Sequence, residues 1–157
     1  MPEHTIQHLS FTMERTINAS VSRVFMAWSN PSAKRRWFVG PRGQWKERVR
    51  EFDFRNGGRE RLVGLFLDGK TSTYDSRFLD IVPEQRIIYT YDMYSDKQRV
   101  SISLATLEFA TLGAGTRLMY REQALILDGA EDASKREKRT GVLFDQMEAS
   151  LRVKPAV

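Results

Sequence analysis

Apolar and polar residues alternate along most of this chain, and the alternation predicts an antiparallel sheet. A first alternating run covers residues 9–18, where Phe11 and Met13 are separated by polar positions. Six further runs follow a helical stretch, at residues 47–54, 59–67, 72–82, 86–94, 100–109 and 116–126. Turn sequences rich in Gly, Asn and Asp separate most of these runs, which favours hairpins. We therefore expect seven strands, six of them in a meander.

Two stretches have helical spacing instead. Ser20 is an N-cap candidate for a short helix that ends at the Asn30-Pro31 pair, and a second short helix follows through residues 33–37. The spacing of apolar residues within 132–153 predicts one long helix. Its apolar face consists of Leu143, Phe144, Met147 and Leu151. Only this helix is large enough to cover the apolar face of the sheet, so the element order predicts an α+β fold.

The composition is that of a soluble globular domain. The 157 residues predict a single domain with its core at residues 9–152 and loosely ordered ends at 1–8 and 153–157. The chain has no cysteine, which excludes disulfides, thiol nucleophiles and cysteine-ligated metals. The N-terminus lacks the features of a signal peptide, and no apolar run approaches the roughly 20 residues that span a bilayer. We expect a cytoplasmic protein without a membrane partner.

Basic residues outnumber acidic ones, giving a formal net charge of +5, but they are spread along the chain. Two short basic runs, Lys34–Arg36 and Lys135–Arg139, raise the question of nucleic-acid binding. The second run is interrupted by an acidic residue. We interpret both runs as solvated helix faces and expect no nucleic-acid partner.

Several segments resemble one protein family in order and spacing. Residues 16–38, TINASVSRVFMAWSNPSAKRRWF, resemble the opening of the branch named after the activator of the 90-kDa heat-shock protein ATPase. Residues 54–59, FRNGGR, and 80–89, DIVPEQRIIY, resemble later segments of that branch, and residues 120–129 resemble a bacterial polyketide-cyclase-like subgroup. The branch lies in the START-like (SRPBCC, birch-pollen-allergen-like) superfamily, and the resemblance covers about residues 9–152.

This resemblance implies the helix-grip fold, in which a curved seven-stranded antiparallel sheet surrounds a long C-terminal helix and two short helices follow strand one. It implies function less directly, because the superfamily includes carriers, cyclases, sensors and chaperone regulators. One expectation is a cavity between sheet and helix that binds a small apolar molecule. The alternative is an interaction protein that modulates a chaperone ATPase. A homodimer is a further option.

The common catalytic sets have little support in this sequence. The two histidines, His4 and His8, fall in the N-terminal segment, where we expect a solvated tail. The glycine pairs lie between strands and read as hairpin turns, so they do not predict a phosphate or dinucleotide loop. We expect no cofactor and no metal, and we leave open whether the chain is an enzyme.

Aromatic residues concentrate in the segments that would surround the space between sheet and helix. They form either an ordinary core or the wall of a ligand cavity. If there is a cavity, we expect Glu122 to be its polar anchor, with Glu60 as a second candidate. The expected wall residues are Trp28, Trp37, Tyr89, Tyr91, Phe144 and Met147.

Two carboxylates are predicted to point inward. Strand alternation puts Glu122 on the face of Leu118 and Tyr120, and Glu60 on the face of Leu62. In the strand of Glu60 the opposite face, with Val63 and Leu65, competes to be the inward one. An inward carboxylate is costly unless it is paired or protonated. Any catalysis would then be proton transfer by Glu122 with Tyr120.

The alternative for both carboxylates is a structural salt bridge. Arg55 and Arg77 are the candidate partners that the sequence suggests.

Overall fold

A computed structural model describes residues 3–152, which form one antiparallel sheet of seven strands with three helices. The strands are β1 (Ile6–Ile17), β2 (Trp45–Phe52), β3 (Arg59–Phe66), β4 (Thr71–Val82), β5 (Arg86–Ser95), β6 (Gln98–Leu112) and β7 (Gly115–Leu127). The helices are α1 (Val21–Ser29), α2 (Pro31–Arg35) and α3 (Ala133–Leu151). Their order in space, β1-β7-β6-β5-β4-β3-β2, confirms the predicted meander and the helix-grip architecture.

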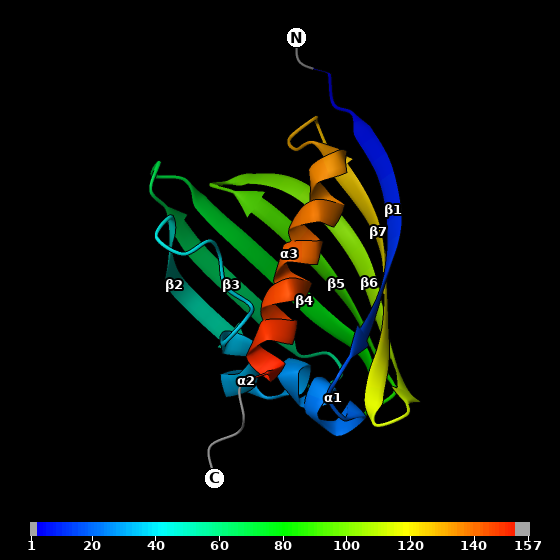
Figure 1. The fold of residues 1–157 in the computed structure, drawn as a ribbon. Helices are drawn as coiled ribbons and strands as arrows, with labels where there is room; N and C mark the ends of the chain where they lie inside the picture. The colour runs from blue at the N-terminus through cyan, green and yellow to red at the C-terminus, as the bar shows by residue number, and fades with distance from the viewer. Residues whose placement is uncertain (1–2, 153–157) are drawn as a thin grey trace.

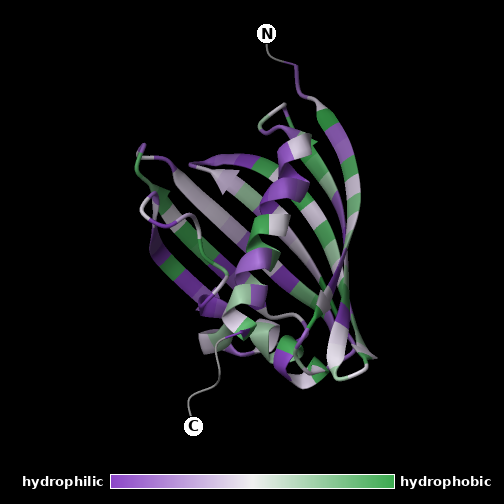
Figure 2. Ribbon diagram, in the orientation of Figure 1, coloured by the Kyte–Doolittle hydropathy of each residue, from purple (hydrophilic) through white to green (hydrophobic). Residues whose placement is uncertain are grey.

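The curved sheet wraps around α3, which crosses its concave face, and the two short helices lie at one end (Figure 1). The strands show alternating polar and apolar bands (Figure 2). Each helix begins at a side chain that caps it. Ser20 accepts a hydrogen bond from the backbone N–H of Arg23, Asn30 does so from Ala33, and Asp132 from Ser134. The predicted N-cap at Ser20 is therefore confirmed.

The first strand is longer than the sequence predicts. Strand β1 starts at Ile6 because it pairs with the far end of β7, where Ile6 lies opposite Leu127. The expectation of a loose segment up to residue 8 is therefore wrong for Ile6 to His8, although both histidines are exposed, as expected. The expected loose end at 153–157 lies outside the described residues.

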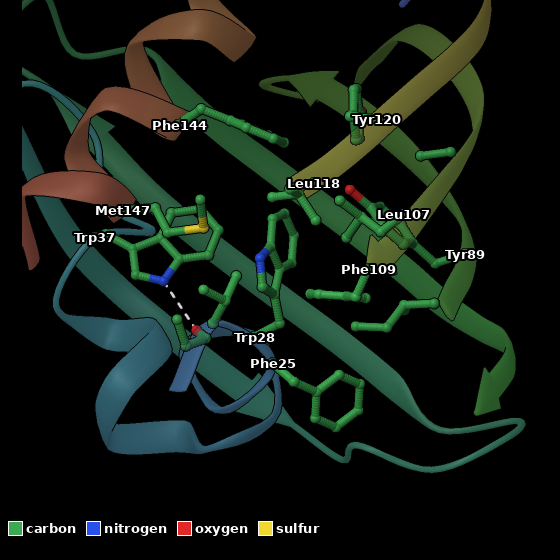
Figure 3. Close-up of a cluster of buried hydrophobic side chains, with 14 of the residues drawn as sticks. Phe25, Trp28, Trp37, Tyr89, Leu107, Phe109, Leu118, Tyr120, Phe144 and Met147 are labelled. Atoms are coloured by element: carbon green, nitrogen blue, oxygen red, sulfur yellow. Dashed lines mark hydrogen bonds between the residues drawn. The ribbon is translucent and has the colours of Figure 1, made fainter. Parts of the chain in front are cut away.

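Aromatic rings fill the space between α3 and the sheet (Figure 3). The Trp28 ring lies 4.7 Å from the Trp37 ring and 5.7 Å from Phe144, measured between centroids. Phe144 in turn lies 5.1 Å from Tyr120 of β7. Edge-to-face contacts of this kind add about 0.5–1.5 kcal/mol each to the burial of the rings. The predicted apolar face of α3 is confirmed at Phe144 and Met147, which are fully buried.

Among the helices of residues 3–152, none combines the length and the apolar character that crossing a bilayer requires.

The contact between α3 and the sheet can be tested at Met147, whose side chain is 0% exposed. Met147→Asp buries a charge without a partner, so we expect a loss of roughly 3–5 kcal/mol in unfolding free energy. Val142→Asp is the matched control, because Val142 lies on the same helix and is 52% exposed. Urea denaturation of both variants gives the comparison, and equal midpoints would contradict this packing.

Candidate functional site

The first buried polar group centres on Arg136, in the first half of α3. The Arg136 side chain is 6% exposed, and its guanidinium donates a hydrogen bond to Glu122 at 3.2 Å. It also donates to the hydroxyls of Ser101 at 2.6 Å and Ser103 at 3.1 Å, and to the carboxylate of Glu131. We call these residues, with Tyr91 and Tyr120, the Arg136 network. It ties the start of α3 to three strands of the sheet.

Glu122 is the acceptor at the middle of this network. The hydroxyls of Tyr91 and Tyr120 both donate to its Oε1 atom, at 2.8 and 2.5 Å. Ser103 donates to Oε2 at 3.3 Å, beside the guanidinium. Burial raises the pKa of both tyrosines, and the charge of Glu122 adds to this effect. Because four donors surround Glu122, a ligand must displace one of them before this carboxylate can exchange a proton with it.

The second buried polar group is an ion pair between α2 and β3. Lys34 Nζ lies 2.5 Å from Glu60 Oε1, and the two residues are 3% and 2% exposed. Burial lowers the pKa of Lys34, while the charge of Glu60 acts in the opposite direction. Four ring centroids lie around the ammonium group, those of Phe38 (4.8 Å), Trp28 (5.3 Å), Phe52 (5.3 Å) and Phe78 (5.8 Å). Aromatic faces at these distances attract a cation.

Two polar atoms near this pair have no hydrogen-bond partner in the described residues. They are Ser76 Oγ and Trp28 Nε1, both buried. Ser76 lies directly opposite Glu60 in the β3–β4 pairing, and the Trp28 ring is one of those around Lys34. We call Lys34, Glu60, Ser76 and Trp28 the Lys34 pocket. A buried polar group without a partner costs about 1–3 kcal/mol, so each of these two groups would gain from one further hydrogen bond.

A cleft of about 340 Å³ leads from the surface to Lys34 and Glu60. Both Lys34 and Glu60 line it, together with residues of α2 and β2. Near its mouth, Glu47 accepts hydrogen bonds from Arg35 and Arg50, each at 2.8 Å. The buried ion pair is therefore the floor of an open site rather than an isolated part of the core.

The structure brings the predicted carboxylates inward, as expected. Glu122 is buried on the face of Leu118 and Tyr120, and Glu60 on the face of Leu62. The predicted wall residues are all buried in the core cluster: Trp28, Trp37, Tyr89, Tyr91, Phe144 and Met147. Of these, Trp28 belongs to the Lys34 pocket and Tyr91 to the Arg136 network.

The predicted partners of the carboxylates are wrong. Arg55 pairs with Asp53 on the surface, and Arg77 donates to the backbone oxygen of Gly57. Each carboxylate is instead paired with a cation from a helix, because the helices and not the neighbouring strands face the concave side of the sheet.

The interpretation of both basic runs as solvated is wrong at one residue in each. Lys34 and Arg136 are buried, although Arg35 and Arg139 beside them are exposed. The spacing of these two residues from buried residues further along the chain could have predicted their burial. Arg136 lies four and eight residues before the buried Thr140 and Phe144, and Lys34 lies three before Trp37.

Metal ligation has no support among residues 3–152, where no three His, Asp or Glu side chains come together around one point. His4 is exposed and its Nδ1 atom lies 3.2 Å from Asp128 Oδ1, while His8 is exposed on β1.

Residues 18–152 match the family model described as Activator of Hsp90 ATPase homolog 1-like protein. A solved structure of an uncharacterized protein from Rhizobium leguminosarum is similar, with 39% identity, a TM-score of 0.91, and coverage of 96% of this chain and 98% of that one. A protein from Rhizobium loti has 39% identity, a TM-score of 0.85, and coverage of 93% and 99%. A protein from Chromobacterium violaceum shares the fold at 23% identity, with a TM-score of 0.76 and coverage of 92% and 98%. No curated protein matches the chain.

The Arg136 network can be tested by removing its cation. Arg136→Met leaves Glu122 buried without a positive partner and removes one of the two cations beside Glu131, so we expect a loss of roughly 3–5 kcal/mol in unfolding free energy. Arg139→Met is the control, because its side chain is 62% exposed and contacts the same Glu131 at 3.4 Å. Its loss should stay below about 1 kcal/mol. If the two variants unfold at the same urea concentration, Arg136 does not hold α3 on the sheet.

Alkaline pH should destabilise the fold through its buried tyrosines. Burial raises the pKa of Tyr74, Tyr89, Tyr91 and Tyr120 above the usual value of 10.0, so they stay protonated in the folded chain. Their stabilisation is complete below pH 10 and declines as the pH rises toward the folded pKa, by up to about 1.4 kcal/mol per pH unit and tyrosine. The lowered pKa of Lys34 has the opposite effect, because the folded chain gains stability as the pH rises toward 10.5, the usual pKa of lysine. Above that pH the lysine no longer changes the stability.

We therefore expect tyrosinate absorbance and loss of circular dichroism to appear together in one cooperative step above pH 10. Tyr89→Phe removes one of these groups and should make the alkaline loss of stability less steep. Gradual ionisation of all tyrosines within a native circular dichroism spectrum would contradict the burial.

Proposed function

This chain belongs to the family of Activator of Hsp90 ATPase homolog 1-like proteins, and we propose that it binds a small, largely apolar ligand between its sheet and its helices. The ligand enters through the cleft between α2 and β2 and places a polar group in the Lys34 pocket. One observation carries this proposal: a cleft reaches the buried Lys34–Glu60 pair, and two neighbouring residues, Ser76 and Trp28, each have a buried polar atom without a hydrogen-bond partner among residues 3–152.

The polar groups of the pocket define the ligand's polar end. The indole N–H of Trp28 can only donate, so it calls for an acceptor oxygen. The Ser76 hydroxyl can donate or accept, and it lies across the sheet from Glu60. A ligand carbonyl, hydroxyl or carboxylate fits these requirements, whereas a hydrocarbon without oxygen leaves both protein groups unpartnered.

The surroundings of the pocket define the rest of the ligand. Phe38, Phe52 and Phe78 surround the Lys34 ammonium, and Phe52 also lines the cleft. Apolar area buried against such rings contributes about 25 cal/mol per Å². The charged residues near the mouth are already paired with each other. An apolar body with one oxygen-bearing end is therefore the best match.

Two finer ideas remain predictions. Proton transfer by Glu122 and Tyr120 needs a ligand that reaches the Arg136 network, and with such a substrate Glu122→Gln should abolish turnover. Modulation of a chaperone ATPase is the alternative that the family description suggests. An ATPase assay with the host's 90-kDa chaperone tests it, and an unchanged rate would dispose of it.

The ligand proposal can be tested with four compounds that share one alkyl chain and differ at the end: octanal, octanol, octanoate and octylamine. We expect at least one oxygen-bearing compound to raise the melting temperature by several degrees at saturation, because it binds only the folded chain. Octylamine should give a smaller shift, since Lys34 already occupies the aromatic site for a cation.

Ser76→Ala separates ligand binding from stability. It removes a buried hydroxyl without a partner, so the free variant should melt at or above the wild-type temperature while most of the ligand-induced shift disappears. Ser10→Ala, at an exposed position of β1, should keep the full shift. A shift that Ser76→Ala leaves undiminished, or no shift with any of the four compounds, would refute the proposal.

A further inference from the structure

The Lys34 amine is a buried nucleophile for which ligand binding alone has no use. Fully buried lysines are rare in proteins, and this one has a single hydrogen-bond partner, Glu60 Oε1 at 2.5 Å. Both residues of the pair line the cleft, so a small molecule in the cleft lies against Lys34 and Glu60. Such a lysine can react in ways that a hydrated surface lysine cannot.

A reactive lysine needs an uncharged nitrogen, which burial favours here although the charge of Glu60 opposes it. Burial in the apolar pocket lowers the pKa of Lys34. The adjacent Glu60 carboxylate can take the proton directly, which turns the ion pair into a neutral amine and a neutral acid without changing the net charge of the pocket. Desolvated lysines in apolar pockets act as nucleophiles toward carbonyl compounds for these reasons.

We propose that Lys34 forms a reversible imine with a small aldehyde or unhindered ketone bound in the cleft, and that Glu60 carries the protons. This inference rests on the proposed function, because the carbonyl compound is the ligand and its oxygen is the polar end.

The reaction balances within the pocket. The neutral amine attacks the carbonyl carbon, an N–C bond forms, and Glu60 protonates the carbonyl oxygen to give a hydroxyl. Glu60 then takes a proton from the nitrogen and returns it to the hydroxyl, which leaves as water when the C–O bond breaks. The product is a protonated imine beside the Glu60 carboxylate, together with one water molecule.

The pocket suits this product as well as it suits the free lysine. The positive charge stays on the same nitrogen, next to the same carboxylate and among the same aromatic rings. A buried charge without a partner would be costly, and the product keeps its positive charge paired with the carboxylate. The oxygen that leaves as water starts near Ser76 and Trp28, the two groups without partners.

Trapping with a reductant tests the proposal. The protein is incubated with octanal and cyanoborohydride at neutral pH, and intact mass and peptide mapping locate the octyl groups. We expect one octyl group on Lys34, formed severalfold faster than on the exposed Lys46, Lys70 and Lys97, because the lowered pKa leaves more of its amine neutral and the cleft holds the aldehyde against it.

Two variants control for folding. Lys34→Arg keeps a cation for Glu60 but cannot form an imine, so it should lose the fast adduct and keep a folded melting profile. The double variant Lys34→Met, Glu60→Gln removes both charges together and should also fold without the adduct. Glu60→Gln alone keeps the lysine but loses the proton carrier, and its trapping rate should fall by tenfold or more.

The outcomes separate this inference from the proposed function. If octanal raises the melting temperature and Ser76→Ala abolishes the shift, but Lys34 is labelled no faster than the exposed lysines, binding stands and the imine is refuted. If Lys34→Arg keeps the fast adduct, the imine is assigned to the wrong residue and is refuted. If octanal neither shifts the melting temperature nor labels Lys34, both proposals fail.

Discussion

The free-energy cost of burying charge governs how the helices sit on this sheet. Two cations from helices, Lys34 of α2 and Arg136 of α3, point into an aromatic interior and are nearly inaccessible to water. Each can stay there only beside a carboxylate from the sheet, Glu60 or Glu122, because an unpaired buried charge would cost several kcal/mol. The two ion pairs therefore fix the rotation and depth of both helices, and apolar packing alone would leave these less defined.

The two buried pairs differ in how completely their neighbourhood is hydrogen-bonded. Around Arg136, hydroxyls from three strands and the Glu131 carboxylate form hydrogen bonds with the guanidinium and with Glu122. These side chains together close the space under α3. Around Lys34, Ser76 and Trp28 keep unpartnered atoms, and a cleft reaches the pair. In a structural network every donor and acceptor needs a hydrogen-bond partner, whereas a binding site needs polar groups that can still form a hydrogen bond to a ligand. This difference, more than burial or charge, separates the two groups functionally.

Family membership explains the architecture without naming the ligand. Residues 18–152 match the family, and relatives at 39% identity retain the fold over nearly their whole length. A helix-grip fold offers an interior between sheet and helix that different sequences fill differently. Here aromatic rings fill most of it, the Arg136 network lies under the start of α3, and the buried ion pair that a cleft reaches lies near α2. The chemistry around that ion pair is therefore a better guide to the ligand than the fold.

The sequence by itself determined the strands, the long helix and the inward direction of Glu122, because a period of two or 3.6 residues is a local property that each segment carries. For Glu60 only the structure decided between the two faces of its strand, since both carry apolar residues. It could not supply their partners. Lys34 meets Glu60 across 26 residues and Arg136 meets Glu122 across 14, and both contacts depend on how the sheet curves around the helices. Basic runs that look solvated in sequence each contain one residue that faces inward. The unpartnered Ser76 and Trp28 likewise exist only in the packed structure, since a hydrogen bond is missing only when every neighbour is in place.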